Sequence, residues 1–142
     1  AVNHFRDIQP KHLDAVKNNV NRLRIQHFIE ENERVFQTAD AFSKKDIISV
    51  GKLLNASHHS LKNLYEVSCD ELDFLAQFAQ NFDGCAGSRM MGGGFGGCTI
   101  NLLRKDKVAA FTNAILPAYK NAFQIEGEIL AFNSVNGAEI IV

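Results

Sequence analysis

This sequence has no long apolar run and no surplus of charge of one sign. No stretch approaches the roughly 18 consecutive apolar residues that a membrane-spanning helix needs. The 15 Lys and Arg residues stand against 16 Asp and Glu residues, which leaves a net charge of −1. Such a chain has no basic field that would attract nucleic acid. We therefore expect no association with a membrane and none with nucleic acid.

Cysteine is scarce as well. The three cysteines, Cys69, Cys85 and Cys98, are odd in number and include no C-x-x-C pair. Five histidines are scattered along the chain, and no spacing typical of metal ligands results. These absences argue against a disulfide framework and against a metal centre. Because reduced thiols are the rule inside cells, we expect a cytoplasmic protein.

The residues that are present predict a globular domain rich in helix. Hydrophobic residues make up 46% of the chain and charged residues 22%, so we expect residues 1–142 to form one domain with its own core. Apolar residues recur at helical spacing over residues 20–42, 47–54, 72–82 and 108–119.

Polar residues at the ends of these segments predict where the helices begin. Ser43, with Asp46 three residues later, is typical of a helix start. Ser68 followed by Glu71 predicts a capping box. Between these two starts, we expect residues 57–60 to form a short turn.

The last third of the chain has the pattern of short strands. Residues 86–91 and 98–103 are expected to be strands, and residues 128–132 and 139–142 are strand candidates around an Asn136-Gly137 turn. Together with the helices, these segments predict the α+β class, with helices packed on one face of a small, mainly antiparallel sheet.

A glycine cluster is the sharpest feature of the sequence. Five of the six residues from 92 to 97 are glycine, and only Phe95 interrupts them. Glycine permits positive φ and close approach to the backbone, and successive backbone N–H groups can form a concave site for anions. A loose hairpin between two strands is the alternative interpretation.

The flanks of the cluster exclude three familiar phosphate loops. Gly92, Gly94 and Gly97 satisfy G-x-G-x-x-G, but a strand-like segment follows them where a dinucleotide fold needs a helix. The segments that protein kinases carry downstream of their glycine loop do not occur. A Walker loop would end in Gly-Lys-Ser/Thr, but this cluster ends in Gly-Cys-Thr.

The same flanks carry a resemblance to a known family. The segment Gly-Ser-Arg-Met-Met-Gly-Gly-Gly-Phe-Gly-Gly-Cys-Thr over residues 87–99 is similar, almost residue for residue, to the third motif of galactokinases, which are sugar kinases of the GHMP type. Residues 65–73, 57–61, 27–35, 5–7 and 136–138 also resemble galactokinase segments, in the same order. Met91 departs from the pattern, because the family has a small hydroxyl residue there.

The resemblance implies a GHMP kinase C-terminal domain with a ferredoxin-like fold, as part of an enzyme that phosphorylates galactose at its anomeric hydroxyl with ATP and Mg²⁺. In such kinases the sugar-binding segment, a Ser-rich phosphate loop and the catalytic Asp belong to an N-terminal domain. None of them matches a segment of this chain. We therefore expect the N-terminal catalytic half to be absent, the chain alone to be inactive, and galactose, ATP and the missing N-terminal domain to be its partners.

The same resemblance leaves two other functions open. A kinase for N-acetylgalactosamine would share these motifs, and so would a catalytically silent, galactokinase-like protein that senses sugar. The catalytic Asp of the missing half would separate an enzyme from a sensor.

The resemblance also implies which residues face the nucleotide and substrate cleft. They are Ser88, Arg89, Gly92, Gly93, Gly94, Phe95, Gly96 and Gly97. No residue is expected to be catalytic and none to bind a metal. Arg89 could contact a phosphate or form a structural ion pair, and Ser88 is expected mainly to complete a strand. His58 and His59 are expected to be structural, and Phe95 to pack in the core.

Overall fold

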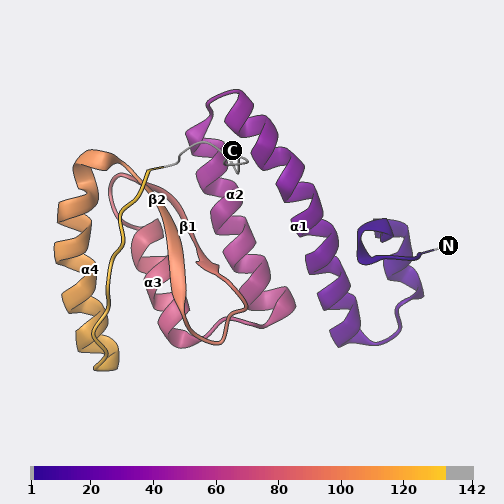
Figure 1. The fold of residues 1–142 in the computed structure, drawn as a ribbon. Helices are drawn as coiled ribbons and strands as arrows, with labels where there is room; N and C mark the ends of the chain where they lie inside the picture. Colours follow the sequence, from indigo (N-terminus) through magenta and orange to yellow (C-terminus); the bar gives the residue numbers. More distant parts are fainter. Residues whose placement is uncertain (1, 134–142) are drawn as a thin grey trace, which may run out of the picture.

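The computed structural model describes residues 2–133 (Figure 1). Three short 3₁₀ turns, one π-helical turn, four α-helices and two strands follow one another along this part of the chain. In chain order they are the 3₁₀ turns Phe5–Asp7 and Pro10–Ala15, α1 (Asn19–Ser43), α2 (Ile47–Ser60), the π-helical turn Leu61–Tyr65, α3 (Asp70–Gln80), β1 (Cys85–Met91), β2 (Cys98–Leu103), the 3₁₀ turn Lys105–Lys107 and α4 (Val108–Phe123).

The predicted helices exist, but one helix start was predicted three residues too early. Ser43 is the last residue of α1, and its hydroxyl donates to the Asp40 carbonyl oxygen at 2.7 Å. The cap of α2 is Asp46, whose carboxylate accepts from the Ser49 N–H at 3.0 Å and from the Ser49 hydroxyl at 2.6 Å. Asp46 thus satisfies one of the free N–H groups at this helix end, the role that the sequence assigned to Ser43.

The predictions of a turn at residues 57–60 and of a Ser68 capping box were also wrong. Residues 57–60 belong to α2, because Ser57, His58 and Ser60 are buried against neighbouring elements and tertiary packing holds them in the helix. The residue at the cap of α3 is Cys69. Ser68 does not cap this helix, because its hydroxyl donates to the carboxylate of Asp73 at 2.6 Å.

The two strands form an antiparallel hairpin that is joined by the glycine loop, residues 92–97. Gly87 lies opposite Leu102 and Met91 opposite Cys98, with an irregularity between Cys85 and Gly87. This arrangement confirms the α+β class and the predicted strands at 86–91 and 98–103.

Residues 128–132 are not a strand, contrary to the prediction. They run alongside α4 and β2 (yellow in Figure 1), and Ile129 packs against the cluster formed by Ala79, Phe111 and Ile115. Their backbone has no hydrogen bond to a strand within residues 2–133, so their placement comes from side-chain packing. The predicted strand at 139–142 and its turn lie outside the described residues.

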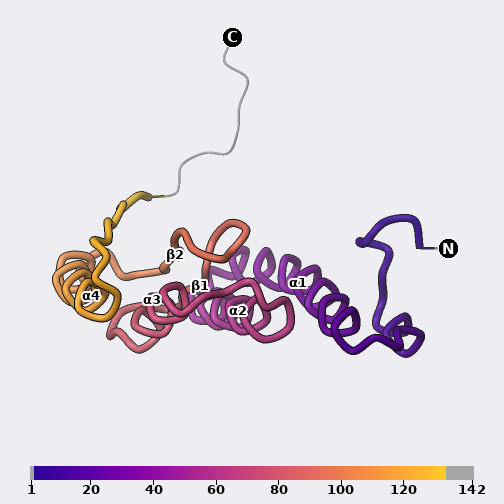
Figure 2. The backbone as a smooth tube through the Cα atoms, turned by 90° about the horizontal axis from the view of Figure 1, so that it is seen from below, coloured from indigo at the N-terminus to yellow at the C-terminus, as the bar shows by residue number. Residues whose placement is uncertain are grey.

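Helices α2 and α3 cover one face of the hairpin, and α1 packs outside α2 (Figures 1 and 2). A second layer of packing joins α4 to α3, with Phe111 set edge-on against the rings of Phe78 and Phe82. None of the helices described here is both long enough and apolar enough to cross a membrane.

Helix α2 approaches the β1 backbone unusually closely through two glycines. A Cβ atom placed on Gly51 would lie 1.9 Å from the Ala86 carbonyl oxygen, and one placed on Gly87 would lie 2.2 Å from the Gly51 carbonyl oxygen. No side chain fits at either position unless the helix and strand move apart. The whole register of α2 on β1 therefore depends on this contact.

We predict that Gly51→Ala lowers the free energy of unfolding by about 1–3 kcal/mol, because the methyl group meets backbone atoms that cannot yield easily. Gly93→Ala is the matched control, since a Cβ there meets no atom within 4 Å; it should change stability by less than about 0.5 kcal/mol. Urea unfolding followed by circular dichroism measures both. A Gly51→Ala protein as stable as wild type would show that the contact is not tight.

Candidate functional site

The glycine loop has a backbone conformation that residues other than glycine rarely adopt. The φ angles of Gly92 and Gly94 are +85°, and those of Gly96 and Gly97 are +139° and +100°. Phe95 also has a positive φ, +61°, which is costly for a residue with a Cβ.

One contact anchors the middle of the loop to the connection between α2 and α3. The Phe95 N–H donates to the Val67 carbonyl oxygen at 2.7 Å. A Cβ atom on Gly94 would lie 2.0 Å from the same oxygen, whereas Gly92, Gly93, Gly96 and Gly97 have no atom within 4 Å of such a position. Gly94 must therefore be glycine for contact as well as for φ.

Phe95 does not pack in the core, contrary to the prediction. Its side chain is 77% exposed. The hydrogen bond of its backbone to Val67 and its left-handed conformation turn the ring outward instead of into the hairpin. An exposed aromatic ring beside open glycines is available for contact with a ligand or with another part of a larger protein.

The glycine amide groups of the loop are available to a ligand. Within residues 2–133, none of the five glycine N–H groups at positions 92–97 donates a hydrogen bond to another residue. Turns of this kind make concave sites for anions because several N–H dipoles point at one place.

Ser88 and Arg89, the two other predicted site residues, lie in the strand that leads to the loop. The side chain of Ser88 is fully buried, and its hydroxyl donates to Asn101 Oδ1 at 2.6 Å. Arg89 donates to the Ser57 hydroxyl at 3.0 Å, and its guanidinium lies 3.7 Å from the Glu31 carboxylate. Both side chains therefore bond to neighbouring parts of this chain. Arg89 makes the structural ion pair that the sequence offered as one of two possible roles.

The outer edge of β1 is closed by side chains instead of a third strand. The Ser88 N–H donates to Asn55 Oδ1 at 2.8 Å, and the Ser88 carbonyl oxygen accepts from Gln80 Nε2 at 3.0 Å. The Met90 N–H donates to His58 Nδ1 at 3.2 Å. Three backbone groups that would otherwise be unpaired at this edge are thereby satisfied.

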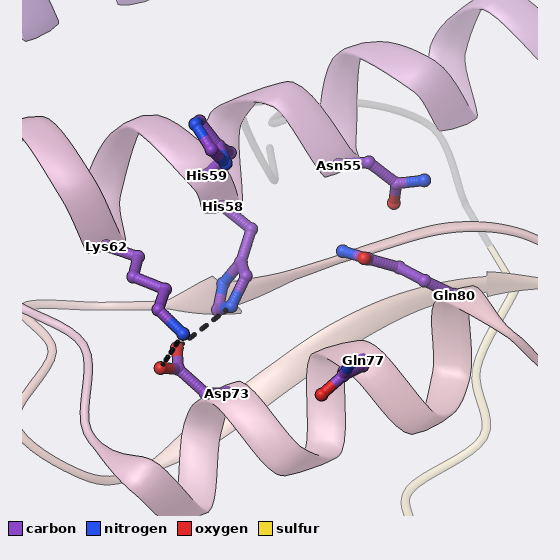
Figure 3. A pocket seen from close by; sticks show the side chains of 7 residues that line it. All are labelled: Asn55, His58, His59, Lys62, Asp73, Gln77 and Gln80. Carbon is purple, nitrogen blue, oxygen red and sulfur yellow. Dashed lines mark ion pairs between the residues drawn. The ribbon is translucent and has the colours of Figure 1, made fainter.

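These edge-binding side chains also line a polar pocket of about 260 Å³ between α2 and α3 (Figure 3). Asp73 lies at its end, with its carboxylate 2.6 Å from the ammonium of Lys62 and 3.3 Å from His58 Nε2. This cluster was not predicted, because its members come from α2, the π-helical turn and α3, and only the fold brings them together. The His58-His59 pair was the only signal of it in the sequence.

Burial and charge set the protonation states of this cluster. Burial lowers the pKa of His58 below the ordinary histidine value, although the carboxylate of Asp73 acts in the opposite direction. Burial acts to raise the pKa of Asp73, but hydrogen bonds from Lys62 and Ser68 outweigh it and the pKa lies below its usual range. A neutral His58 that accepts at Nδ1 carries its proton on Nε2, facing the ionised Asp73.

The sequence of this chain is similar to those of known proteins. The model of the family "GHMP kinases C terminal" matches residues 38–121. The galactokinase of Thermotoga petrophila is 38% identical over 135 residues, 95% of this chain and 37% of that protein. The galactokinase of Staphylococcus carnosus is 40% identical over 131 residues, 92% of this chain and 34% of that protein.

Solved structures show the same relationship. The crystal structure of Lactococcus lactis galactokinase complexed with galactose superposes with a TM-score of 0.83 at 36% identity, and the match covers 89% of this chain and 34% of that one. L. major mevalonate kinase shares the fold, with a TM-score of 0.56 at 24% identity over 80% of this chain and 32% of that one. The chain thus spans about a third of the length of the relatives it matches.

The family model covers more than half of the chain and includes α2, α3, the hairpin and the glycine loop. The resemblance of the glycine motif to GHMP kinases is thereby confirmed at the level of the family. The chain belongs to the GHMP kinases, as their C-terminal domain.

Proposed function

We propose that this chain is the C-terminal part of a galactokinase, which transfers a phosphoryl group from ATP to the anomeric hydroxyl of galactose. The observation that carries this proposal is the glycine loop, with its open N–H groups, on a fold that superposes on the galactose-bound Lactococcus lactis enzyme. The named curated relatives are galactokinases. Neither an N-acetylgalactosamine kinase nor a silent sugar sensor has a specific observation in its favour.

The loop suits the chemistry of phosphoryl transfer, which depends mainly on positioning and on stabilising charge. Residues 92–97 would present backbone donors to the phosphates of ATP, and the absence of side chains would let the nucleotide approach the backbone closely. ATP supplies the phosphoryl group that is transferred. Ser88 and Arg89 would support this site from the strand below it.

Mg²⁺ would be held by another part of the enzyme. The described residues contain no group of three or more His, Cys, Asp or Glu side chains that could hold a metal ion. Mg²⁺ in such kinases would instead be held by phosphate oxygens and by few protein ligands. A base, a Ser-rich phosphate loop and a sugar-binding segment would likewise come from the N-terminal domain of a longer protein.

The three cysteines are free thiols, which accords with the cytoplasmic location that we propose. Galactose and ATP would be the small-molecule ligands, held between this chain and the N-terminal domain. The exposed Phe95 and the glycine loop would lie at that boundary.

We predict that Gly94→Val in the full-length enzyme lowers kcat/KM by at least about tenfold, on the order of 1.4 kcal/mol of transition-state stabilisation. The valine side chain would collide with the Val67 carbonyl oxygen and displace the loop. Steady-state kinetics with ATP and galactose measure the effect, and circular dichroism establishes that the variant is folded. Wild-type kinetics from a folded variant would contradict a role of the loop in catalysis.

We also predict that the 142-residue chain alone does not phosphorylate galactose. It carries no match to the catalytic Asp, and its loop faces water, where electrostatic interactions are weak. An ADP-release assay with galactose or N-acetylgalactosamine, ATP and Mg²⁺ tests the chain alone and after mixing with a separately prepared N-terminal domain. Turnover by the chain alone would overturn the two-domain division, and activity only on mixing would support it.

A further inference from the structure

His58 is buried between β1, the strand that leads into the glycine loop, and α3. It comes from α2, is only 7% exposed, and contacts β1 with one ring nitrogen and α3 with the other. Its Nδ1 accepts from the N–H of Met90, which is the second residue before the loop. Its Nε2 faces Asp73, as Figure 3 shows.

Asp73 connects this histidine to the second anchor of the loop. Its carboxylate accepts from the hydroxyl of Ser68 at 2.6 Å. The residue before Ser68 is Val67, whose carbonyl oxygen accepts from the Phe95 N–H in the middle of the loop. The start and the middle of the loop are therefore both tied to the same carboxylate, one through His58 and one through the 67–68 backbone.

The loop itself contributes little to its own position. A Cβ on Gly92, Gly93, Gly96 or Gly97 would meet no atom within 4 Å, so the space beside these residues is open. Where the loop N–H groups point is set by the strand that enters the loop and by the Val67 contact. A small shift of Met90 would move the donors relative to a bound phosphate, and misplacement of about 1 Å can cost on the order of a hundredfold in rate.

We propose that His58 is a positioning residue for the glycine loop, acting through the Met90 N–H and oriented by Asp73. The inference rests on the proposed function, because a positioned loop matters only if it binds the phosphates. His58 touches neither substrate nor cofactor in this arrangement. It holds Met90, and with it the start of the loop, in place. Contacts behind a reactive site orient the ligands of that site in the same way.

Protonation of His58 would break this connection, because Nδ1 could no longer accept. The charged groups that face the ring are Asp73 from α3, Lys62 from the π-helical turn and Arg89 from β1. Burial and the two cations favour the neutral ring, while Asp73 favours the charged one. The connection is thus present at neutral pH and is lost as the pH falls below the ordinary histidine value of about 6.5.

Substitutions at two neighbouring histidines test the proposal in the full-length enzyme. His58→Leu removes the acceptor, whereas His58→Asn keeps one, because Oδ1 of asparagine is attached to Cγ as Nδ1 is. His59→Leu is the matched control, since His59 is exposed on the same helix. We expect His58→Leu to lower kcat at least about tenfold with KM for galactose changed less than about threefold. His58→Asn and His59→Leu should stay within about threefold of wild-type kcat.

A second readout does not depend on kinase activity or on the folding of a variant. Amide and imidazole NMR signals of the wild-type chain are followed from about pH 8 to about pH 5. We expect the amide signals of Met90 and of residues 92–97 to shift with the same midpoint as the His58 ring. Loop amide signals that do not shift as the His58 ring titrates would overturn the proposal. A folded His58→Leu enzyme with wild-type kcat would overturn it as well. If the full-length protein phosphorylates no sugar, the proposed function fails, while the NMR titration still decides whether His58 sets the loop.

Discussion

Helix α2 lies against the edge of β1 with no side chain between the two backbones at Gly51 and Gly87. This contact brings the next two turns of the helix within reach of the strand, so that Asn55 and His58 bond to its backbone amides. Gln80 from α3 completes the edge. A strand that would otherwise expose donors and acceptors is closed by side chains of the helices that cover the hairpin.

The position of the glycine loop follows from this edge. β1 enters the loop directly after Met91, and the Val67 carbonyl oxygen holds its middle. The loop can therefore be rich in glycine and still be placed, because its supports lie outside it. A site for phosphates benefits from this division, since backbone donors fixed before the reaction cost no reorganisation during it.

The pattern of apolar residues was enough to predict the long helices and the two strands of the hairpin. It failed where tertiary contacts decide the structure. Residues 57–60 have turn-like polarity, yet Ser57 and His58 continue α2 because their polar groups bond to Glu31, Arg89 and Met90. Residues 128–132 hold a short apolar run like that of a strand, but Ile129 packs beside α4 without a strand partner among the described residues.

For the same reason, the sequence predicted only part of the candidate site. Glycines mark the loop, since four of them hold a positive φ that other residues rarely adopt. Gln80 and Asn55 carry no such mark, because their role arises from bonds to a strand that lies elsewhere in the chain. Asp73 carries none either, because only the fold brings its partners His58 and Lys62 to it. Phe95 was misplaced because a large aromatic residue usually packs inward, whereas here the backbone turn directs it outward.

Hydrogen exchange of the Ser88 and Met90 amides tests the central claim most directly, namely that helix side chains close the edge of β1. If Asn55 and His58 accept from these amides, the protection factors of both amides should lie within about tenfold of that of the Arg89 amide. The backbone groups of Arg89 face β2, because the hydrogen-bonding direction alternates along an antiparallel ladder. Exchange of Ser88 and Met90 at the rates of unstructured amides, with Arg89 still protected, would contradict the account.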